Sequence, residues 1–285
     1  MIPASFDYVR AKSVPDALKT LASNDGAKVL AGGHSLIPLL RLRLAQPATL
    51  VDIGGLDDLR GLTAKGRGLR LGALSTYRDL LDSPLVRERY PLLIEATETI
   101  GDLPVRNAGT IGGALAHADP ASDLPAVMLA LDATFQLRSR SGRRAVPARE
   151  FFQGPFTTAL GPGELLVEIV LPPPPRNAGM AYVSFEQQAS GYAIVGVAAV
   201  VARSRKTVNH CTVGVTGAGD RPYLAQSAAK LIGTTAEGDA IAAVAGAVVE
   251  GVEVTSDIHA PADFRAHLAR VATRRALQTA LRRSG

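Results

Sequence analysis

Two pairs of adjacent glycines constrain this chain more than any other feature of its sequence. Gly32-Gly33 follows the short expected strand 28–30, and Gly112-Gly113 lies in a second segment flanked by apolar residues. Adjacent glycines allow the backbone to turn tightly and to present successive N–H groups to an anion. Neither pair matches the Rossmann or P-loop pattern. Each pair alone is more typical of a tight turn, but two such loops in one domain could together clasp a pyrophosphate.

The first 171 residues predict short strands alternating with helices. The glycine density of residues 106–113 predicts that no stable helix forms there. Ser141-Gly142, inside a cluster of four arginines, predicts a solvated hairpin turn. The expected helices cover residues 14–21, 76–81, 91–99 and 123–131, and the expected strands cover 28–30, 50–53, 69–71, 134–137 and 165–171.

Four consecutive prolines at 172–175 predict a stiff, extended segment, which we interpret as a domain boundary. Beyond it, residues 181–185, 193–202 and 210–215 predict an antiparallel sheet, and 240–249 and 261–281 predict helices. In the last helix, Phe264, Leu268, Val271 and Leu281 form an apolar stripe, and the arginines lie mostly off it. We therefore expect an α+β fold: a domain over 1–175 with two subdomains meeting near residue 55, and a C-terminal domain over 176–285.

Composition excludes several classes of function. The net charge of +5 is spread thinly and aromatic residues do not interleave with the basic ones, which argues against nucleic-acid binding. The one cysteine, Cys211, allows no internal disulfide and cannot hold an iron–sulfur cluster, which usually needs four. The N-terminus does not resemble a signal peptide, and the longest apolar run, 193–202, is far shorter than the roughly 20 residues of a membrane span. We expect a cytoplasmic protein.

The residues around the glycine pairs resemble a known family. Residues 31–38, 41–47 and 50–53 are similar to the first flavin-binding segment of the FAD-binding medium subunit of molybdenum hydroxylases, of the carbon monoxide dehydrogenase and xanthine dehydrogenase type. Residues 106–125 resemble the second segment, and residues 256–277 resemble the closing helix of that family. The resemblance covers nearly the whole chain and implies a flavin domain of the vanillyl-alcohol-oxidase fold type.

The resemblance also implies a cofactor, a site and partners. It implies that both glycine loops hold the pyrophosphate of FAD, that Asp123 contacts the cofactor, and that Tyr192 lies against the isoalloxazine. A small iron–sulfur subunit would deliver electrons from a large molybdopterin subunit, and FAD would pass them to an external acceptor. No residue of this chain would act as a catalytic acid or base or bind a metal. The implied cofactor-binding residues are Ala31, Gly32, Gly33, His34, Ser35, Leu36, Thr110, Ile111, Gly112, Gly113, Ala114, Asp123, Leu165, Leu166, Gln187 and Tyr192.

The chain departs from the family pattern at two of these positions. Ala114 stands where the family usually has asparagine, and Gln187 stands where it often has lysine. Both departures bear on FAD affinity or flavin potential.

Two other functions, and other roles for several single residues, remain open. The chain could be a stand-alone FAD oxidoreductase of the vanillyl-alcohol-oxidase type or a scaffold that has lost FAD. Asp123 could serve only as a helix cap, and Tyr192 only as a half-buried strand residue. His117 and Asp119 could bind a metal, but no third ligand has suitable spacing.

Overall fold

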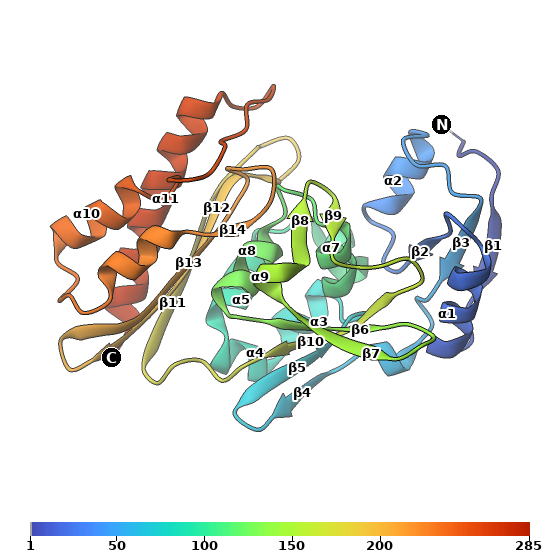
Figure 1. Cartoon of the computed structure of the whole chain (residues 1–285), viewed down its shortest axis with the longest axis horizontal. Coiled ribbons are helices and arrows are strands. Elements are labelled where there is room, and N and C mark those ends of the chain that lie inside the picture. Colours follow the sequence, from blue (N-terminus) through green and yellow to red (C-terminus); the bar gives the residue numbers. More distant parts are fainter. Residues whose placement is uncertain (1) are drawn as a thin grey trace.

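The computed structural model describes residues 2–285, which form three layered parts from the N-terminus to the C-terminus (Figure 1). The N-terminal part is a parallel sheet in the order β1-β3-β2. The expected first helix begins where the sequence predicts, because Ser13 Oγ accepts a hydrogen bond from Asp16 N at 3.2 Å. Its elements are β1 Asp7–Arg10, α1 Val14–Ser23, β2 Lys28–Leu30, α2 Leu36–Arg41, β3 Thr49–Asp52 and η1 Asp57–Leu59.

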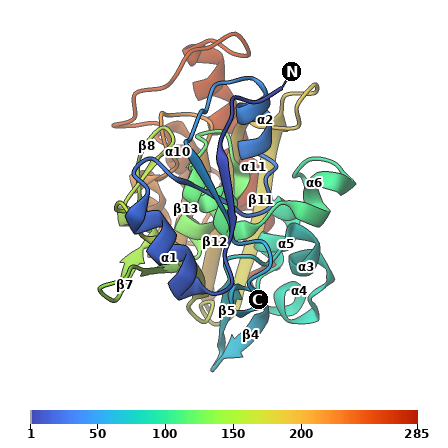
Figure 2. The same ribbon diagram turned by 90° about the vertical axis from the view of Figure 1, so that its right-hand side faces the viewer.

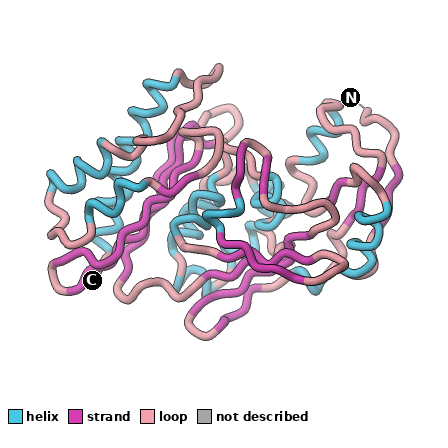
Figure 3. Tube along the Cα trace, viewed as in Figure 1, coloured by secondary structure: helices cyan, strands magenta, loops and turns pink. Residues whose placement is uncertain are grey.

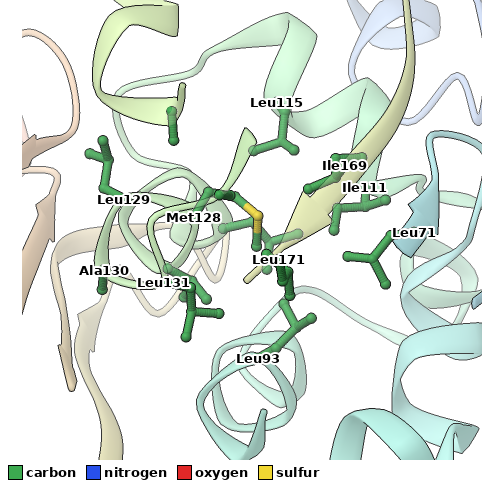
Figure 4. Close-up of a cluster of buried hydrophobic side chains, with 14 of the residues drawn as sticks. Leu71, Leu93, Ile111, Leu115, Met128, Leu129, Ala130, Leu131, Ile169 and Leu171 are labelled. Carbon is green, nitrogen blue, oxygen red and sulfur yellow. The ribbon is translucent and has the colours of Figure 1, made fainter. Parts of the chain in front are cut away.

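The central part is an antiparallel sheet in the order β4-β5-β10-β6-β7, with helices covering one of its faces. Leu71 and Ile169 from the sheet pack against Ile111, Leu115 and Met128 from the helices (Figure 4). The elements are β4 Leu62–Lys65, β5 Gly68–Gly72, α3 Tyr77–Asp82, α4 Pro84–Arg89, α5 Pro91–Glu98, α6 Leu103–Ala108, α7 Ile111–His117, α8 Asp123–Ala130, β6 Thr134–Arg138, β7 Arg143–Pro147, α9 Ala148–Phe151, β8 Phe152–Gly154, β9 Thr157–Thr158 and β10 Leu165–Leu171.

The expectation that residues 106–113 form no helix was wrong. Helix α6 extends to Ala108, and α7 carries Gly112 and Gly113 in its first turn. A Cβ at Gly112 would lie 2.6 Å from the carbonyl oxygen of Ala73, so only glycine allows this close packing of α7 on the sheet edge. This tertiary contact offsets the roughly 1 kcal/mol that each glycine costs in a helix.

The arginine hairpin forms as expected. Ser139 N donates to Gly142 O at 2.9 Å and closes the turn between β6 and β7. The second strand of the hairpin is β7, which the sequence did not predict, whereas β10 pairs with the opposite edge of β6.

The C-terminal part is an antiparallel sheet in the order β11-β12-β13-β14, so the three expected strands are confirmed and a short fourth is added. Helices α5 and α8 pack on one face and α11 on the other (Figures 1 and 3). Ala198 and Val200 face the central part while Val197 and Val201 face α11, which explains the unbroken apolar run of β12. The elements are β11 Ala178–Glu186, β12 Ala193–Ser204, β13 Thr207–Thr216, β14 Tyr223–Leu224, η2 Gln226–Leu231, α10 Gly238–Gly246 and α11 Ala262–Arg283.

The prediction of which residues form the apolar stripe of α11 was partly wrong. Phe264 is 48% exposed, whereas Arg265 is only 4% exposed. The buried face consists mainly of alanines together with Leu268, Leu277 and Leu281. Small residues are needed because the helix backbone lies very close to β11: a Cβ at Gly179 would lie 1.9 Å from the carbonyl oxygen of Ala280.

Over residues 2–285 we find no helix that combines the length and the hydropathy of a membrane span.

Candidate functional site

The first glycine loop presents free N–H groups. Within residues 2–285, the N–H groups of residues 32–35 donate to no backbone carbonyl, and Ile37 N closes the turn on Gly33 O at 2.8 Å. Gly33 has φ +76°, a left-handed conformation that glycine adopts without strain. His34 is exposed and Ser35 is half-buried. A run of unpartnered N–H groups in such a turn is a binding site for an anion.

The second glycine loop, in contrast, uses its N–H groups internally. Ile111 N donates to Ser75 O at 3.0 Å, Gly112 N to Ala73 O at 2.8 Å, and Gly113 N to Thr110 Oγ1 at 3.2 Å. Sequence reasoning treated the two glycine pairs as equivalent. The structure shows that the second pair fixes the position of α7, while the first pair carries the free donors.

The two loops lie against each other. A Cβ at Gly32 would lie 2.0 Å from the carbonyl oxygen of Ala108, and a Cβ at Gly113 would lie 4.0 Å from Ala31 Cβ. Gly32 is therefore required for the contact between the loops. This contact brings together residues that are about 80 positions apart in sequence and belong to the N-terminal and the central part.

The β11–β12 turn carries Gln187 and Tyr192. Gln187 N donates to Tyr192 O at 2.8 Å, and Gln187 Oε1 accepts from Ser190 N at 2.7 Å and from Ser190 Oγ at 2.8 Å. The amide oxygen of Gln187 thus stabilises its own turn. This turn places Tyr192 directly before β12, and 44% of the residue is exposed.

The ring of Tyr192 reaches the first loop. Burial raises the pKa of the Tyr192 phenol, the carboxylate of Asp119 raises it further, and the nearby Ser35 hydroxyl lowers it. Ser35 of the first glycine loop and Asp119 of the segment that joins α7 to α8 are therefore both near the Tyr192 phenol. The structure therefore brings loop residues 31–36, loop residues 110–114 and Tyr192 to one place.

Asp123 forms a buried pair with a residue that the sequence did not single out. Tyr182 Oη donates to Asp123 Oδ1 at 2.5 Å, and both side chains are buried. Burial raises the pKa of Asp123 to about 7, although the bond from Tyr182 lowers it. A Cβ at Gly196 would lie 2.1 Å from Tyr182 Oη, so this glycine makes room for the phenol. A glycine inside an apolar strand is the signal that could have revealed the close approach.

Two of the expected site residues have their side chains in the cores. Leu165 and Leu166 are 5% and 4% exposed, the first in the core of the N-terminal part and the second in the core of the central part. Ser122, rather than Asp123, occupies the N-cap position of α8.

Arg265 connects the closing helix to this site. Its Nη1 donates to Ile194 O and to Gly217 O, both at 2.7 Å, and its Nη2 lies 2.7 Å from Asp257 Oδ1. Ile194 follows Tyr192 by two residues, and Gly217 N donates to Pro120 O at 2.8 Å. Arg265 therefore holds the start of β12 and the α7–α8 segment in one arrangement.

The described residues form no candidate metal site. Residues 2–285 contain no group of three or more His, Cys, Asp or Glu residues that could hold a metal ion. Burial raises the pKa of the Cys211 thiol to about 12, so this thiol is protonated at neutral pH.

The buried Asp123 makes stability depend on pH, and the Asp123→Asn variant tests this. The folded-state pKa of about 7 exceeds the ordinary value of 3.8. Between these two values the folded state holds a proton that the unfolded state has lost, so the free energy of unfolding falls as pH rises. We expect this free energy in the FAD-free protein to fall, relative to Asp123→Asn, by up to about 1.4 kcal/mol per pH unit between about pH 5 and pH 6.5.

Urea unfolding at three pH values in that window measures this difference. Tyr182→Phe removes the bond that lowers the pKa of Asp123. The pH range over which the free energy of unfolding falls should therefore extend to higher pH. Parallel stability curves for the wild type and Asp123→Asn would contradict the prediction.

The fold and the site define a class of protein. A loop of free N–H groups, which suits a phosphate anion, lies against a glycine-bearing helix start and near a half-exposed tyrosine from the C-terminal sheet. Two family models match the chain: FAD binding domain in molybdopterin dehydrogenase over residues 4–174, and CO dehydrogenase flavoprotein C-terminal domain over residues 180–280.

Relatives and solved structures agree with these models. The chain is 38% identical to the carbon monoxide dehydrogenase medium chain of Hydrogenophaga pseudoflava, with 98% of each chain covered. It is 39% identical to the glyceraldehyde dehydrogenase medium chain of Sulfolobus acidocaldarius, with 98% of this chain and 99% of the relative covered. The quinoline 2-oxidoreductase structure from Pseudomonas putida 86 matches with a TM-score of 0.94 and 31% identity, with 100% of both chains covered. The chain belongs to the family of FAD-binding medium subunits of molybdenum hydroxylases, and it is an oxidoreductase subunit.

Proposed function

We propose that this chain is the flavin-carrying electron-transfer subunit of a molybdenum hydroxylase complex. Electrons from iron–sulfur clusters on a partner subunit would leave through FAD to an external acceptor. The observation that carries the proposal is the meeting of the free N–H groups of residues 32–35 with loop 110–114 and Tyr192. FAD supplies the redox chemistry when bound, and the protein supplies binding, orientation and electrostatics.

The residues of the site divide these tasks. The N–H groups of residues 32–35 would donate to the pyrophosphate oxygens. A Cβ at Gly113 would lie 2.7 Å from Thr110 Oγ1 and 4.0 Å from Ala31 Cβ, so glycine keeps the second loop closely packed beside the first. Tyr192 would present its half-exposed ring to the isoalloxazine. Gln187 would not contact the flavin through its amide oxygen, because that oxygen already stabilises the turn.

A partner must carry the other redox centres. The one cysteine of the chain is buried, and the described residues contain no metal cluster site. Relatives are named as a medium chain and as a subunit of a dehydrogenase complex. Ile37, Leu42 and Leu44, on and just after α2, are 45%, 52% and 73% exposed and adjoin the first glycine loop. We place the docking surface of the iron–sulfur subunit on these side chains, because exposed apolar groups next to the flavin site suit an electron-transfer interface.

The substrate of the complex is not encoded in this chain. Relatives at 38% to 39% identity are named for carbon monoxide, glyceraldehyde and 6-hydroxypseudooxynicotine. Since similar identities accompany different names, the substrate would be selected by the molybdopterin subunit. The proposal includes a domain boundary at the prolines 172–175 and a cytoplasmic location, which the single unpaired cysteine supports.

Reconstitution with FAD tests the proposal. We expect the purified chain to bind one FAD noncovalently and to show the visible spectrum of a flavoprotein. Acid precipitation should release the yellow colour into the supernatant. Colour that stays in the pellet would contradict noncovalent binding, and an absence of flavin after reconstitution would exclude the proposed function.

A further inference from the structure

The arginine hairpin lines a cavity that the flavin site does not use. A cavity of about 310 Å³ lies between α1 and the β6–β7 turn, and it is lined by Lys19, Arg138 and Arg140. A second cavity of about 300 Å³ is lined by Arg70, Arg138 and Arg143. The two cavities share Arg138. Figures 1 and 2 show α1 beside this hairpin, at the junction of the N-terminal and central parts.

The charges of these cavities are unbalanced. Five cationic side chains line them, against two carboxylates, Asp58 and Glu168. Glu168 is already engaged by Arg70, with 2.5 Å between Arg70 Nε and Glu168 Oε2. Among residues 2–285, the remaining cations form no ion pair with a carboxylate: Lys19, Arg138, Arg140 and Arg143.

The hairpin places two of these cations in an unfavourable arrangement. Arg138 and Arg143 stand directly opposite each other in the β6–β7 ladder. Like charges at such positions destabilise a strand pair unless a counterion lies between them. The charge of the neighbouring Arg144, in contrast, is balanced by an ion pair with Glu164, with 2.6 Å between Arg144 Nη2 and Glu164 Oε2. Arg138 and Arg143 have no such partner within the chain.

We propose that these cavities form an anion site for a small molecule with at least two oxyanion groups, phosphate or carboxylate. Guanidinium groups bind both kinds of oxyanion through paired N–H donors. A ligand with two such groups could contact Arg138 from either cavity and bridge Arg140 and Arg143. Sites at the junction of two subdomains are common places for small ligands. Because α1 and the hairpin belong to different parts, an anion there would link them.

Calorimetric titration of the FAD-saturated chain tests this site, since bound FAD removes the flavin loop as a competing phosphate site. Pyrophosphate and citrate at low ionic strength serve as probes for phosphates and for carboxylates. We expect one saturable site for at least one of them. We expect the double variant Arg140→Gln, Arg143→Gln to weaken that binding by roughly tenfold or more, because it removes two charge-assisted contacts from exposed positions.

The control is Lys206→Gln, which removes an exposed cation from the β12–β13 turn outside both cavities. It should change the affinity less than twofold, and all variants should keep the flavin spectrum. The site would be excluded if neither probe bound saturably to the wild type. Equal weakening by Lys206→Gln and by the double variant would also exclude it, because the attraction would then be diffuse.

Discussion

Gly33→Val should lower FAD affinity by at least about 100-fold while the chain remains folded. A β-branched residue resists the left-handed conformation that Gly33 adopts at φ +76°, so the loop must rearrange. The N–H groups of residues 32–35 would then no longer point to one anion. Loss of two charge-assisted hydrogen bonds is enough for the expected change. The atoms nearest to a Cβ at this position belong to the side chains of Ile37 and Leu30, which can move, so the fold should survive.

Gly26→Val is the matched control for this substitution. Gly26 has φ +73°, and a Cβ there would meet nothing within 4 Å. It therefore carries the same backbone strain without contact to the proposed site. Flavin content, FAD titration and thermal unfolding should show that both variants lose similar stability and that only Gly33→Val loses FAD. Normal flavin content in purified Gly33→Val would show that this loop does not bind the pyrophosphate.

The isolated chain should oxidise no organic substrate at a measurable rate, and activity should appear only with an iron–sulfur and a molybdopterin partner. The chain has one cysteine, whereas an iron–sulfur cluster usually needs four, so we expect the second redox centre on a partner subunit. Burial raises the pKa of Asp123 to about 7, but this carboxyl group is buried and bonded to Tyr182 and so is not available to a substrate. Dye-linked or NAD(P)H-linked reduction of the flavin would not count against this prediction, because it needs no substrate site.

Anaerobic titration of the flavin absorbance with candidate substrates measures this, in a sample free of molybdenum and iron. Stoichiometric bleaching by an organic substrate would overturn the prediction and favour a stand-alone FAD oxidoreductase.

Ile37→Glu tests the proposed docking surface of the iron–sulfur subunit. It should weaken assembly with the iron–sulfur partner and leave FAD content normal. Ile258→Glu, at a position 95% exposed in the C-terminal part, is the control and should assemble normally.

The sequence predicted the parts of the fold that depend on neighbouring residues. Helix α1 begins at Val14, after the cap residue Ser13 and with Pro15 in its first turn, and the arginine hairpin turns at Ser141-Gly142. Caps and turns are determined by a few adjacent side chains. The apolar run of β12 predicted a strand of an antiparallel sheet, which the structure confirms. The long motifs around the glycines also identified the family and its FAD cofactor, both of which the comparisons confirm. The individual cofactor-binding residues remain a prediction.

Other features could be seen only in the tertiary structure. The helical state of Gly112 depends on contact with Ala73, and the burial of Arg265 depends on the carbonyl groups of Ile194 and Gly217, far away in sequence. The pairing of Tyr182 with Asp123 joins residues 59 positions apart.

The sequence by itself determined that the chain carries two glycine loops of a flavin-binding family and an α+β fold. The tertiary structure decided that the first loop keeps its N–H groups free while the second uses them within the protein. The physical reason is that glycine content fixes where a backbone can turn or approach closely. Whether an N–H group stays free depends on which carbonyl groups the folded chain brings within reach.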